Sequence, residues 1–206
     1  MGHHLLSDYN KKFIVGDTSD SFHLTVRRAK ASDLLALVDI LFTSFKPHSG
    51  PVCYFSSVLR LGLYEDLRYS LRSSDSNQCI YLVATVSPAA GLLHQSVVVG
   101  AVEITFFRNL PFGLKASYYP YLSNLAIRAD YRRQGIGREL LRSCEAAVGE
   151  QGLEDLYLHV LKDNYPARQL YDGAGYRLRQ ADSFWQGWLF HQSQRLLLHK
   201  SISPPV

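Results

Sequence analysis

The stretch Arg132-Arg133-Gln134-Gly135-Ile136-Gly137 decides the fold, because of what stands on either side of it. A strand-like apolar run, 121–127, precedes it, and an amphipathic helix-like run, 138–148, follows it. Gly135 and Gly137 can take positive φ and let a ligand come close to the backbone. The first N–H groups of the helix point outward and carry the positive end of its dipole. The stretch therefore predicts a turn that binds a pyrophosphate.

This turn differs from the two commoner phosphate-binding loops. It has no Gly-Lys-Ser/Thr, as in the P-loop, and no Gly-x-Gly-x-x-Gly, as in the dinucleotide fingerprint, so it indicates a different cofactor. We expect the pyrophosphate to lie on backbone N–H groups from Arg133 to Arg138, a span that includes Gln134 and Ile136. Arg132 or Arg133 would add charge. The competing interpretation is a surface pair of arginines ahead of an ordinary helix, which the two glycines disfavour.

Two sequence blocks, in a fixed order, carry a resemblance to a known family. The runs 122–127 and 131–141 resemble the acyl-CoA signature of the GNAT (GCN5-related) N-acetyltransferases. The strand-like run 158–160, followed by 164–171 and 173–176, is similar to the family's next strand and the helix whose Asn and Tyr contact the cofactor. A lone Arg-x-x-Gly-x-Gly would be weak evidence, but the two blocks together are specific.

Outside these blocks the chain looks similar to the plastid-type and bacterial protein acetyltransferase branch. The features that carry this likeness are the long first segment, the strand-like run 99–104, and an ending that contains Trp185, Trp188 and the run 195–198.

The resemblance implies an α/β GNAT fold, with a mixed central sheet of about six to seven strands flanked by about four helices. A splayed parallel pair of strands would bind the acyl-CoA. The hydrophobic pattern agrees, because strands and helices are predicted in this order: strand 22–26, helix 32–42, helix 55–71, a hairpin of strands 79–86 and 97–107, strand 121–127, helix 138–148, strand 155–161, helix 164–173, and strands 176–179 and 194–200.

The domain organisation follows from polarity and length. Residues 1–21 are polar with little periodicity, which predicts a flexible N-terminal arm. The remaining residues, 22–206, are apolar enough along their length to build one core, so a single acetyltransferase domain is expected. We assign no role to His3 and His4.

The backbone of the strand 121–127 has two implied tasks. The pantetheine arm of CoA should pair like an extra strand with Leu125 and Ile127. A backbone N–H near Leu125 or Ala126 would stabilise the tetrahedral oxyanion, as the family implies.

Asn164 and Tyr171 stand seven residues apart, two helical turns, so both can face one ligand, with Ala167 between them. Tyr171 matches the family tyrosine that protonates the departing thiolate, which a phenol of pKa about 10 can do. The alternative is a packed helix tyrosine. Asn164 could instead cap the helix, and the two roles are compatible.

The acceptor amine must lose a proton, and three residues could accept it. They are Glu103, Tyr121 and His159, and a Tyr and a His occupy the matching positions in the protein N-terminal acetyltransferase branch. Each also has an ordinary structural explanation: solvent exposure for Glu103, sheet packing for Tyr121 and a satisfied core histidine for His159.

A loop is predicted at 110–119, whose aromatic residues either line an acceptor groove or pack on the sheet: Phe112, Tyr118 and Tyr119.

Composition limits the partners. A formal charge of +4 suits an anionic ligand such as CoA, but the charges are too scattered to favour nucleic acid. Cys53, Cys79 and Cys144 lack metal-ligand spacing, so no metal is expected, and we interpret them as core residues of a protein from a reducing compartment. No apolar run reaches the roughly 20 residues of a membrane helix, so no membrane association is expected.

These observations together predict an acetyl-CoA-dependent N-acetyltransferase that transfers acetyl directly to a primary amine. The preferred acceptors are protein N-terminal α-amines, lysine ε-amines or both, in the cytoplasm or a plastid stroma-like compartment. The protein would be a monomer or a homodimer. One alternative is an acetyltransferase of small amines. The other is a CoA-binding sensor without turnover, which Tyr171 disfavours because a pure binder does not need the phenol.

Overall fold

The computed structural model describes residues 10–15, 22–45, 56–72, 79–88, 96–109, 117–181 and 194–202. The chain divides into two compact units. The first unit comprises Met1–Glu103 and Asn124–Ser143, and the second comprises Ile104–Ser123 and Cys144–Val206.

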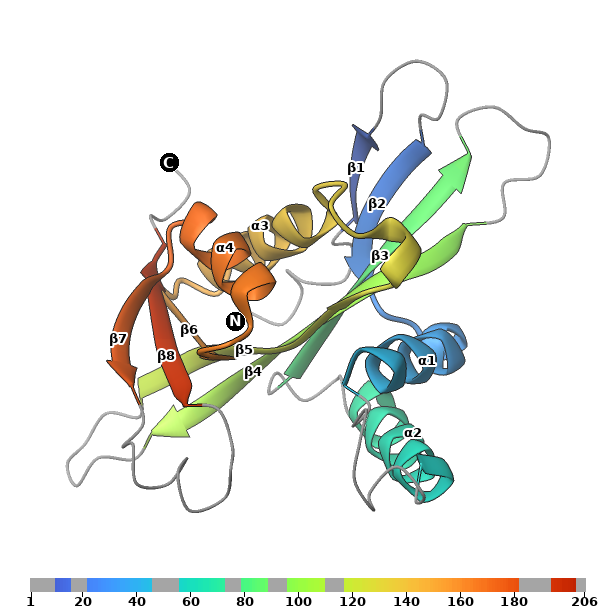
Figure 1. Ribbon diagram of the computed structural model, residues 1–206, viewed down its shortest axis with the longest axis horizontal. Coiled ribbons are helices and arrows are strands. Elements are labelled where there is room, and N and C mark those ends of the chain that lie inside the picture. Colours follow the sequence, from blue (N-terminus) through green and yellow to red (C-terminus); the bar gives the residue numbers. More distant parts are fainter. Residues whose placement is uncertain are drawn as a thin grey trace, which may run out of the picture. The chain divides into compact units, whose positions relative to one another are not determined.

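The first unit contains an antiparallel run of strands (Figure 1). Strand β1 (Asn10–Val15) pairs with β2 (Phe22–Arg28), and β2 pairs in turn with β3 (Cys79–Pro88). The first part of β4 (Val97–Asn109) and the last part of β5 (Ser117–Ile127) complete it. A hydrogen bond of 2.9 Å from the Arg128 N–H to the Val99 carbonyl fastens the end of β5 to β4.

Strand β1 lies within the segment that the sequence predicted to be a flexible arm. Phe13, Ile14 and Val15 stand opposite Leu24, His23 and Phe22 of β2. The expectation of an arm is therefore wrong for residues 10–15. The charged residues around this short run concealed its β propensity, and β2 offers it an edge to pair with.

Helices α1 (Leu34–Phe45) and α2 (Ser56–Arg72) pack against the strands of the first unit through an apolar core. Side chains at helical spacing on α1 meet alternate side chains of β3, β4 and β5, as expected for helices covering a sheet face. The buried members of this core are Leu37, Val38, Ile40, Leu41, Leu67, Tyr81, Val83, Ala101 and Ala126.

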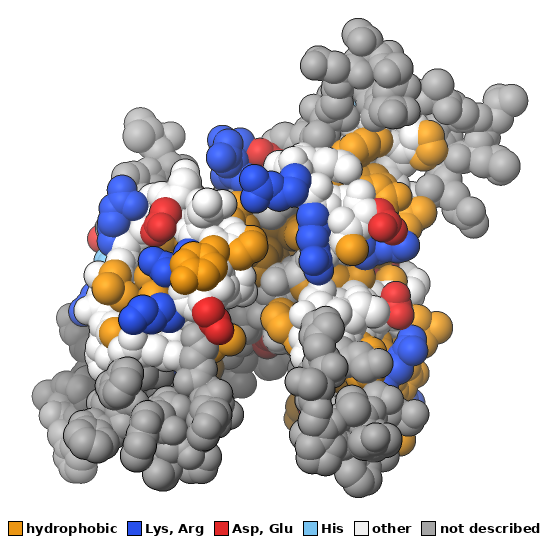
Figure 2. Space-filling model, in the orientation of Figure 1, with side chains coloured by type: hydrophobic (Ala, Val, Ile, Leu, Met, Phe, Trp, Pro, Cys, Tyr) orange, Lys and Arg blue, Asp and Glu red, His pale blue; other side chains and the backbone are white. Residues whose placement is uncertain are grey.

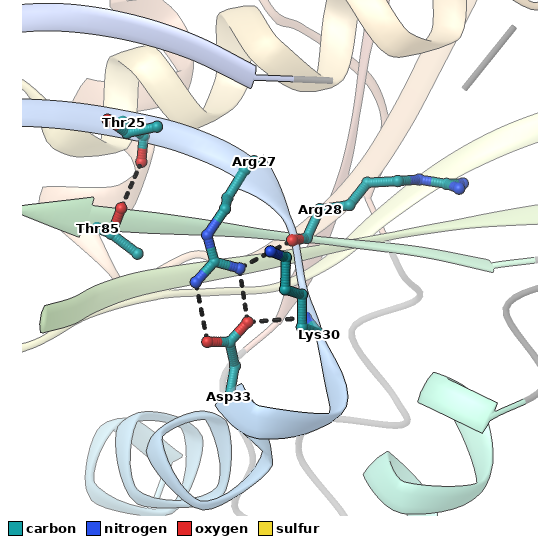
Figure 3. Close-up of polar contacts among 6 residues, drawn as sticks. All are labelled: Thr25, Arg27, Arg28, Lys30, Asp33 and Thr85. Carbon is teal, nitrogen blue, oxygen red and sulfur yellow. Dashed lines mark hydrogen bonds and ion pairs between the residues drawn. The ribbon is translucent and has the colours of Figure 1, made fainter. Parts of the chain in front are cut away.

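A partly buried ion pair stabilises the start of α1 (Figure 3). Two nitrogens of Arg27 bond the two carboxylate oxygens of Asp33 at 2.7 and 2.9 Å. The same carboxylate accepts the backbone N–H of Lys30 at 2.7 Å, so it also caps the 3₁₀ turn that leads into α1. Burial opposes ionisation of Asp33, but these bonds outweigh it and hold the pKa of the carboxyl below its usual range.

The second unit is built around β6 (Asp155–Leu161), β7 (Arg177–Ala181) and β8 (Arg195–Ser201), beside the first part of β5 (Figure 1). Strand β6 is antiparallel to β8, which is antiparallel to β7. Strand β5 is parallel to β6, and their register contains only Tyr121 with Tyr157 and Leu122 with Leu158. This short register confirms the predicted splayed parallel pair. Helix α4 (Tyr165–Gly173) and the end of α3 (Ile136–Gly149) complete the unit.

The predicted α/β fold is confirmed, with some differences in detail. The described residues form eight strands, where about six to seven were expected, and β1 is the addition. Strand β5 begins at Ser117, so Tyr118 and Tyr119 belong to a strand and not to the predicted loop, because their β propensity outweighs the neighbouring Pro120. Phe112, Cys53, the hairpin turn at 89–95, and Trp185 with Trp188 lie outside the described residues. None of the helices in the described part is long and apolar enough to cross a membrane.

Candidate active site

The predicted phosphate turn lies in the first unit, directly before α3. Gly135 has a φ of 81° and Arg133 a φ of 64°, both in the left-handed region. Gly137, which the sequence allowed to take a positive φ, is instead the second residue of α3, and the second left-handed residue is Arg133. A left-handed non-glycine residue costs roughly 1–2 kcal/mol, and such strain is common at functional sites. Ile136 is buried and anchors the helix start in the core.

The hydrogen bonds at the start of α3 reduce the number of backbone N–H groups that are left to bind an anion. The N–H groups of Arg138 and Glu139 both donate to the Gly135 carbonyl, at 3.0 and 3.2 Å. The backbone N–H of Arg138, which was expected to bind the pyrophosphate, is therefore already used within the helix. Among the residues that the structure describes, no acceptor receives the backbone N–H groups from Arg133 to Gly137. These groups, at the positive end of α3, are the ones that an anion could use.

The basic side chains of the turn divide into two kinds. Arg132 bonds the Ile127 carbonyl through Nε at 3.0 Å, so it ties the turn to the end of β5. Gln134 likewise bonds a carbonyl of the preceding 3₁₀ turn at 3.3 Å. Arg133 and Arg138 are exposed, and Figure 2 shows basic side chains gathered in the part of the view where α3 begins. Arg133 and Arg138 therefore supply exposed positive charge, while Arg132 has a structural bond.

The strand behind the turn is packed closely against α3. An added Cβ on Gly100 would lie 2.8 Å from Cδ1 of Ile127 and 3.2 Å from Cδ1 of Leu140. Ala126 is buried, and Leu125 and Ile127 are half-buried. The absence of a side chain at Gly100 thus lets β4, β5 and α3 come together here.

A left-handed residue interrupts β5 just before the segment predicted to hold the pantetheine. Asn124 has a φ of 54°, and its Nδ2 donates to Glu103 Oε2 at 2.6 Å. Glu103 also accepts from Cys79 Sγ at 3.3 Å, and the buried Tyr81 lies near its carboxylate. Burial, followed by the charge of Glu103, raises the pKa of Tyr81. Cys79 is partly buried and packs against the apolar core of the first unit, as the sequence predicted, and it also donates this hydrogen bond.

Sequence reasoning did not identify Asn124 as a site residue. A signal was present, since Asn is rare within strands and is one of the few residues that tolerate the left-handed region.

In the second unit, two of the candidate bases contact each other. The hydroxyl of Tyr121 lies 2.8 Å from Nδ1 of His159, and both residues are half-buried. Both project from the face of β5 and β6 opposite the buried Leu122, Leu158 and Val160. Further aromatic and imidazole side chains share this face, and sequence reasoning gave them no role: Phe107, Tyr157 and His199. The alternation in the run 155–160 was the available signal.

Tyr171 is buried in the second unit, with its ring 5.8 Å from that of Tyr176. Burial, followed by the nearby Cys144 and Tyr121, raises the pKa of Tyr171 above the usual tyrosine range. The phenol therefore keeps its proton at neutral pH. Because it stays protonated, the phenol has a proton to give and cannot act as a base, although the raised pKa makes it a weaker acid than a free tyrosine.

Asn164 is the N-cap of α4, and its side chain accepts the N–H of Ala167 at 3.3 Å. The capping role that the sequence left open is thus present, and contact with a cofactor stays a prediction. Cys144 is fully buried on α3, and burial raises the pKa of its thiol. Its interpretation as a core residue is confirmed, and a buried protonated thiol is no nucleophile.

An α/β sheet with a splayed parallel pair, and a left-handed glycine turn leading into a helix, define a class of proteins that bind acyl-CoA. Residues 52–176, more than half of the chain, match the profile of the Acetyltransferase (GNAT) family, and the chain belongs to this family. The family that the two sequence blocks resemble is thereby confirmed.

Named relatives agree with the branch that the sequence resembles. GCN5-related N-acetyltransferase 10, chloroplastic, of Arabidopsis thaliana is 28% identical over 153 residues, which cover 73% of this chain and 60% of that protein. The [Ribosomal protein bS18]-alanine N-acetyltransferase of Escherichia coli is 38% identical over 55 residues, which cover 27% of this chain and 37% of that protein. The chain thus spans less than two thirds of either relative.

The fold is shared with a solved structure, the PaiA N-acetyltransferase from Thermoplasma acidophilum in complex with coenzyme A. It matches with a TM-score of 0.65 at 20% identity, over 86% of this chain and 98% of that one. At this identity the likeness shows the fold alone.

Proposed function

We propose that this protein is an acetyl-CoA-dependent N-acetyltransferase that acetylates protein amines directly, at N-terminal α-amines, lysine ε-amines or both. The observation that carries the proposal is the 2.8 Å contact between Tyr121 and His159, near a buried Tyr171 that holds its proton. The E. coli relative, whose name specifies an alanine of a ribosomal protein as its acceptor, supports a protein substrate. The chloroplastic name of the Arabidopsis relative supports a plastid-like compartment beside the cytoplasm.

The Tyr121–His159 pair would remove the proton of the acceptor. A protonated α-amine, of pKa about 8, or lysine ε-amine, of pKa about 10.4, is not nucleophilic. Before the nitrogen attacks, one proton of the ammonium group would pass to the Tyr121 oxygen while the hydroxyl proton of Tyr121 passes to Nδ1 of His159, which leaves a neutral amine with a lone pair for the attack. This requires the neutral histidine tautomer that carries its hydrogen on Nε2.

Tyr171 would act at the other end of the reaction. Acetyl-CoA supplies a thioester, whose C–S bond breaks as the new C–N bond forms. The phenol of Tyr171 would give its proton to the departing sulfur. No covalent enzyme intermediate is needed, because correct positioning of amine and thioester supplies much of the acceleration.

The residues that would hold acetyl-CoA are those predicted from the sequence, except that the backbone N–H of Arg138 is already bonded to the Gly135 carbonyl. The backbone N–H groups from Arg133 to Gly137 would bind the pyrophosphate, with charge from the turn arginines. The backbone of Leu125 and Ile127 would pair with the pantetheine amides, and a backbone N–H near Ala126 would stabilise the oxyanion. Asn164 and Ala167, at the start of α4, complete the set.

The test is acetyl-CoA turnover, measured as free thiol release against two peptide libraries. One library has free N-termini and no lysine, and the other has blocked N-termini and internal lysines. Tyr171→Phe should lower kcat by about 10² or more, the usual contribution of a proton donor. Tyr165→Phe is the matched control, since Tyr165 is an exposed residue of the same helix and should retain wild-type turnover.

The outcomes separate the proposed function from its alternatives. Turnover with either library that collapses in Tyr171→Phe supports a protein acetyltransferase and identifies its acceptor. Turnover only with polyamines or arylalkylamines would overturn the protein substrate. Tight CoA binding without turnover of any amine would overturn the enzymatic function.

A further inference from the structure

Glu103 stands at the centre of a polar cluster in the first unit. Its Oε2 accepts from Asn124 Nδ2 at 2.6 Å, and its Oε1 accepts from Cys79 Sγ at 3.3 Å. The hydroxyl of Tyr81, a residue only 7% exposed, lies near the same carboxylate, whose charge adds to burial in raising the pKa of Tyr81. Three side chains from two other strands thus converge on one carboxylate.

This arrangement differs from what a general base requires. A base needs a lone pair directed at the proton that it removes. Each oxygen of Glu103 already gives one of its two lone pairs to a hydrogen bond within the protein, and the nearby Tyr81 belongs to the apolar core under α1, as does Ala101 two residues earlier on β4. The carboxylate is therefore built into the packing of the first unit.

The cluster around Glu103 holds an irregular backbone conformation at Asn124. Along the chain, the register of β5 with β6 includes Leu122 and extends no further in the described part. Asn124 follows two residues later, with a φ of 54°. A left-handed residue breaks the regular alternation of a strand and redirects the backbone groups that follow it, and we refer to this local irregularity at Asn124 as the bulge. Those groups belong to Leu125 and Ala126, the predicted partners of pantetheine and oxyanion.

Asn tolerates the left-handed region, but nothing in its backbone requires it. The short bond to Glu103 makes the left-handed conformation the one in which the Asn124 side chain is satisfied. Without that bond, the backbone of β5 could relax to extended geometry. A cofactor that needs the bulged form would then bind only the fraction of molecules that retains it, and its apparent affinity would fall by that fraction.

We propose that Glu103 is a positioning residue: its carboxylate holds Asn124, and through Asn124 the bulge that prepares the backbone of β5 for acyl-CoA. This rests on the proposed acetyl-CoA-dependent function for its ligand. The chemistry of the acceptor proton belongs to other residues.

Two variants at Asn124 test the proposal, because alanine and glycine both remove the side-chain bond but differ in how readily their backbone adopts positive φ. Asn124→Ala removes the bond and disfavours positive φ, whereas Asn124→Gly removes the same bond but adopts positive φ freely. We expect Asn124→Ala to raise the Kd of CoA, measured by calorimetry, about tenfold, or about 1.4 kcal/mol. Asn124→Gly should raise it no more than about threefold, because only the bulge geometry matters for binding. Equal weakening in both variants would overturn the proposal.

Variants at Glu103 separate positioning from base catalysis. Glu103→Ala should weaken CoA binding about tenfold in the wild-type background but much less in the Asn124→Gly background, where no bond is needed to hold the bulge. Glu103→Gln can keep a bond to Asn124, because the Asn amide can rotate to accept one. It should therefore retain the acidic limb of the pH profile of kcat/KM. Loss of that limb, with a fall of 10² or more, would identify Glu103 as the base.

The readouts also separate this inference from the proposed function. If the wild-type protein binds CoA but acetylates no amine, the function fails while the order of the Kd values still tests the bulge. If the wild-type protein does not bind CoA, both fail. Thermal unfolding of each variant accompanies every Kd, and a Kd change that only follows lost stability would overturn the positioning role.

Discussion

Replacing Gly100 by alanine should disturb the packing directly behind the phosphate turn. The new Cβ would lie 2.8 Å from Cδ1 of Ile127, 3.2 Å from Cδ1 of Leu140 and 3.3 Å from the Ala126 carbonyl oxygen. The first two atoms end flexible side chains and can move, but the carbonyl belongs to the backbone of β5. Overpacking of this kind costs about 1–3 kcal/mol. Alanine also restricts the unfolded chain more than glycine does, and this offsets about 0.4–1 kcal/mol of the loss in folding free energy.

The net loss should be about 1–2 kcal/mol, which for a chain of this length lowers Tm by roughly 2–8 °C. Because the displaced groups belong to β5 and α3, CoA affinity should also fall. The matched control is Gly62→Ala on α2, where an added Cβ meets nothing within 4 Å. It should raise stability by up to about 1 kcal/mol, through helix propensity alone.

The assay is thermal unfolding of both variants beside the wild type, with calorimetry of CoA binding. A Gly100→Ala protein as stable as Gly62→Ala, with wild-type affinity, would refute the argument that close packing requires glycine at this position.

Three further predictions concern single residues. Asp33→Asn should destabilise the fold fully at pH 7 and progressively less as pH falls from about 3.9, the unfolded pKa of Asp, through the lower pKa of Asp33 in the folded state, because the stability that a lowered pKa provides is lost over that window. Urea unfolding at pH 7 and at several pH values within that window checks it, and a constant difference would contradict it. Asn164→Ala should lower stability by about 1 kcal/mol through loss of the α4 cap, and Asn164→Asp should not, as measured by thermal unfolding. In the native protein Cys144 should resist alkylation until unfolding, whereas Cys79 reacts first; mass spectrometry of labelled peptides would show the order, and early labelling of Cys144 would disprove its burial.

The sequence predicted best where several local signals agreed. Strand β5, the turn and α3 were evident because an apolar run, two glycines and a helical pattern follow one another. The proximity of Tyr121 to His159 could also be predicted, since both were identified as candidate bases on strands predicted to be parallel. Their contact confirms proximity, and their catalytic role stays a proposal.

What the sequence could not give depended on backbone conformation and on distant partners. The left-handed φ fell on Arg133 and not on Gly137, because the position of the helix start decides which residue must turn. The roles of Asn124 and Glu103 depend on each other across 21 residues of sequence, which no local pattern records. Strand β1 was missed because a strand on an edge is defined by its neighbour as much as by its own residues.

Strand β1 also has a practical consequence for anyone who shortens this protein. It covers the outer edge of β2, so its backbone groups occupy donors and acceptors that would otherwise be open. Trimming the chain past Val15, an obvious step toward a tidier crystallisation target, would expose that edge to other copies of the molecule. The shortened protein would then be prone to aggregate through β2 during purification and storage, even with every residue of the site intact.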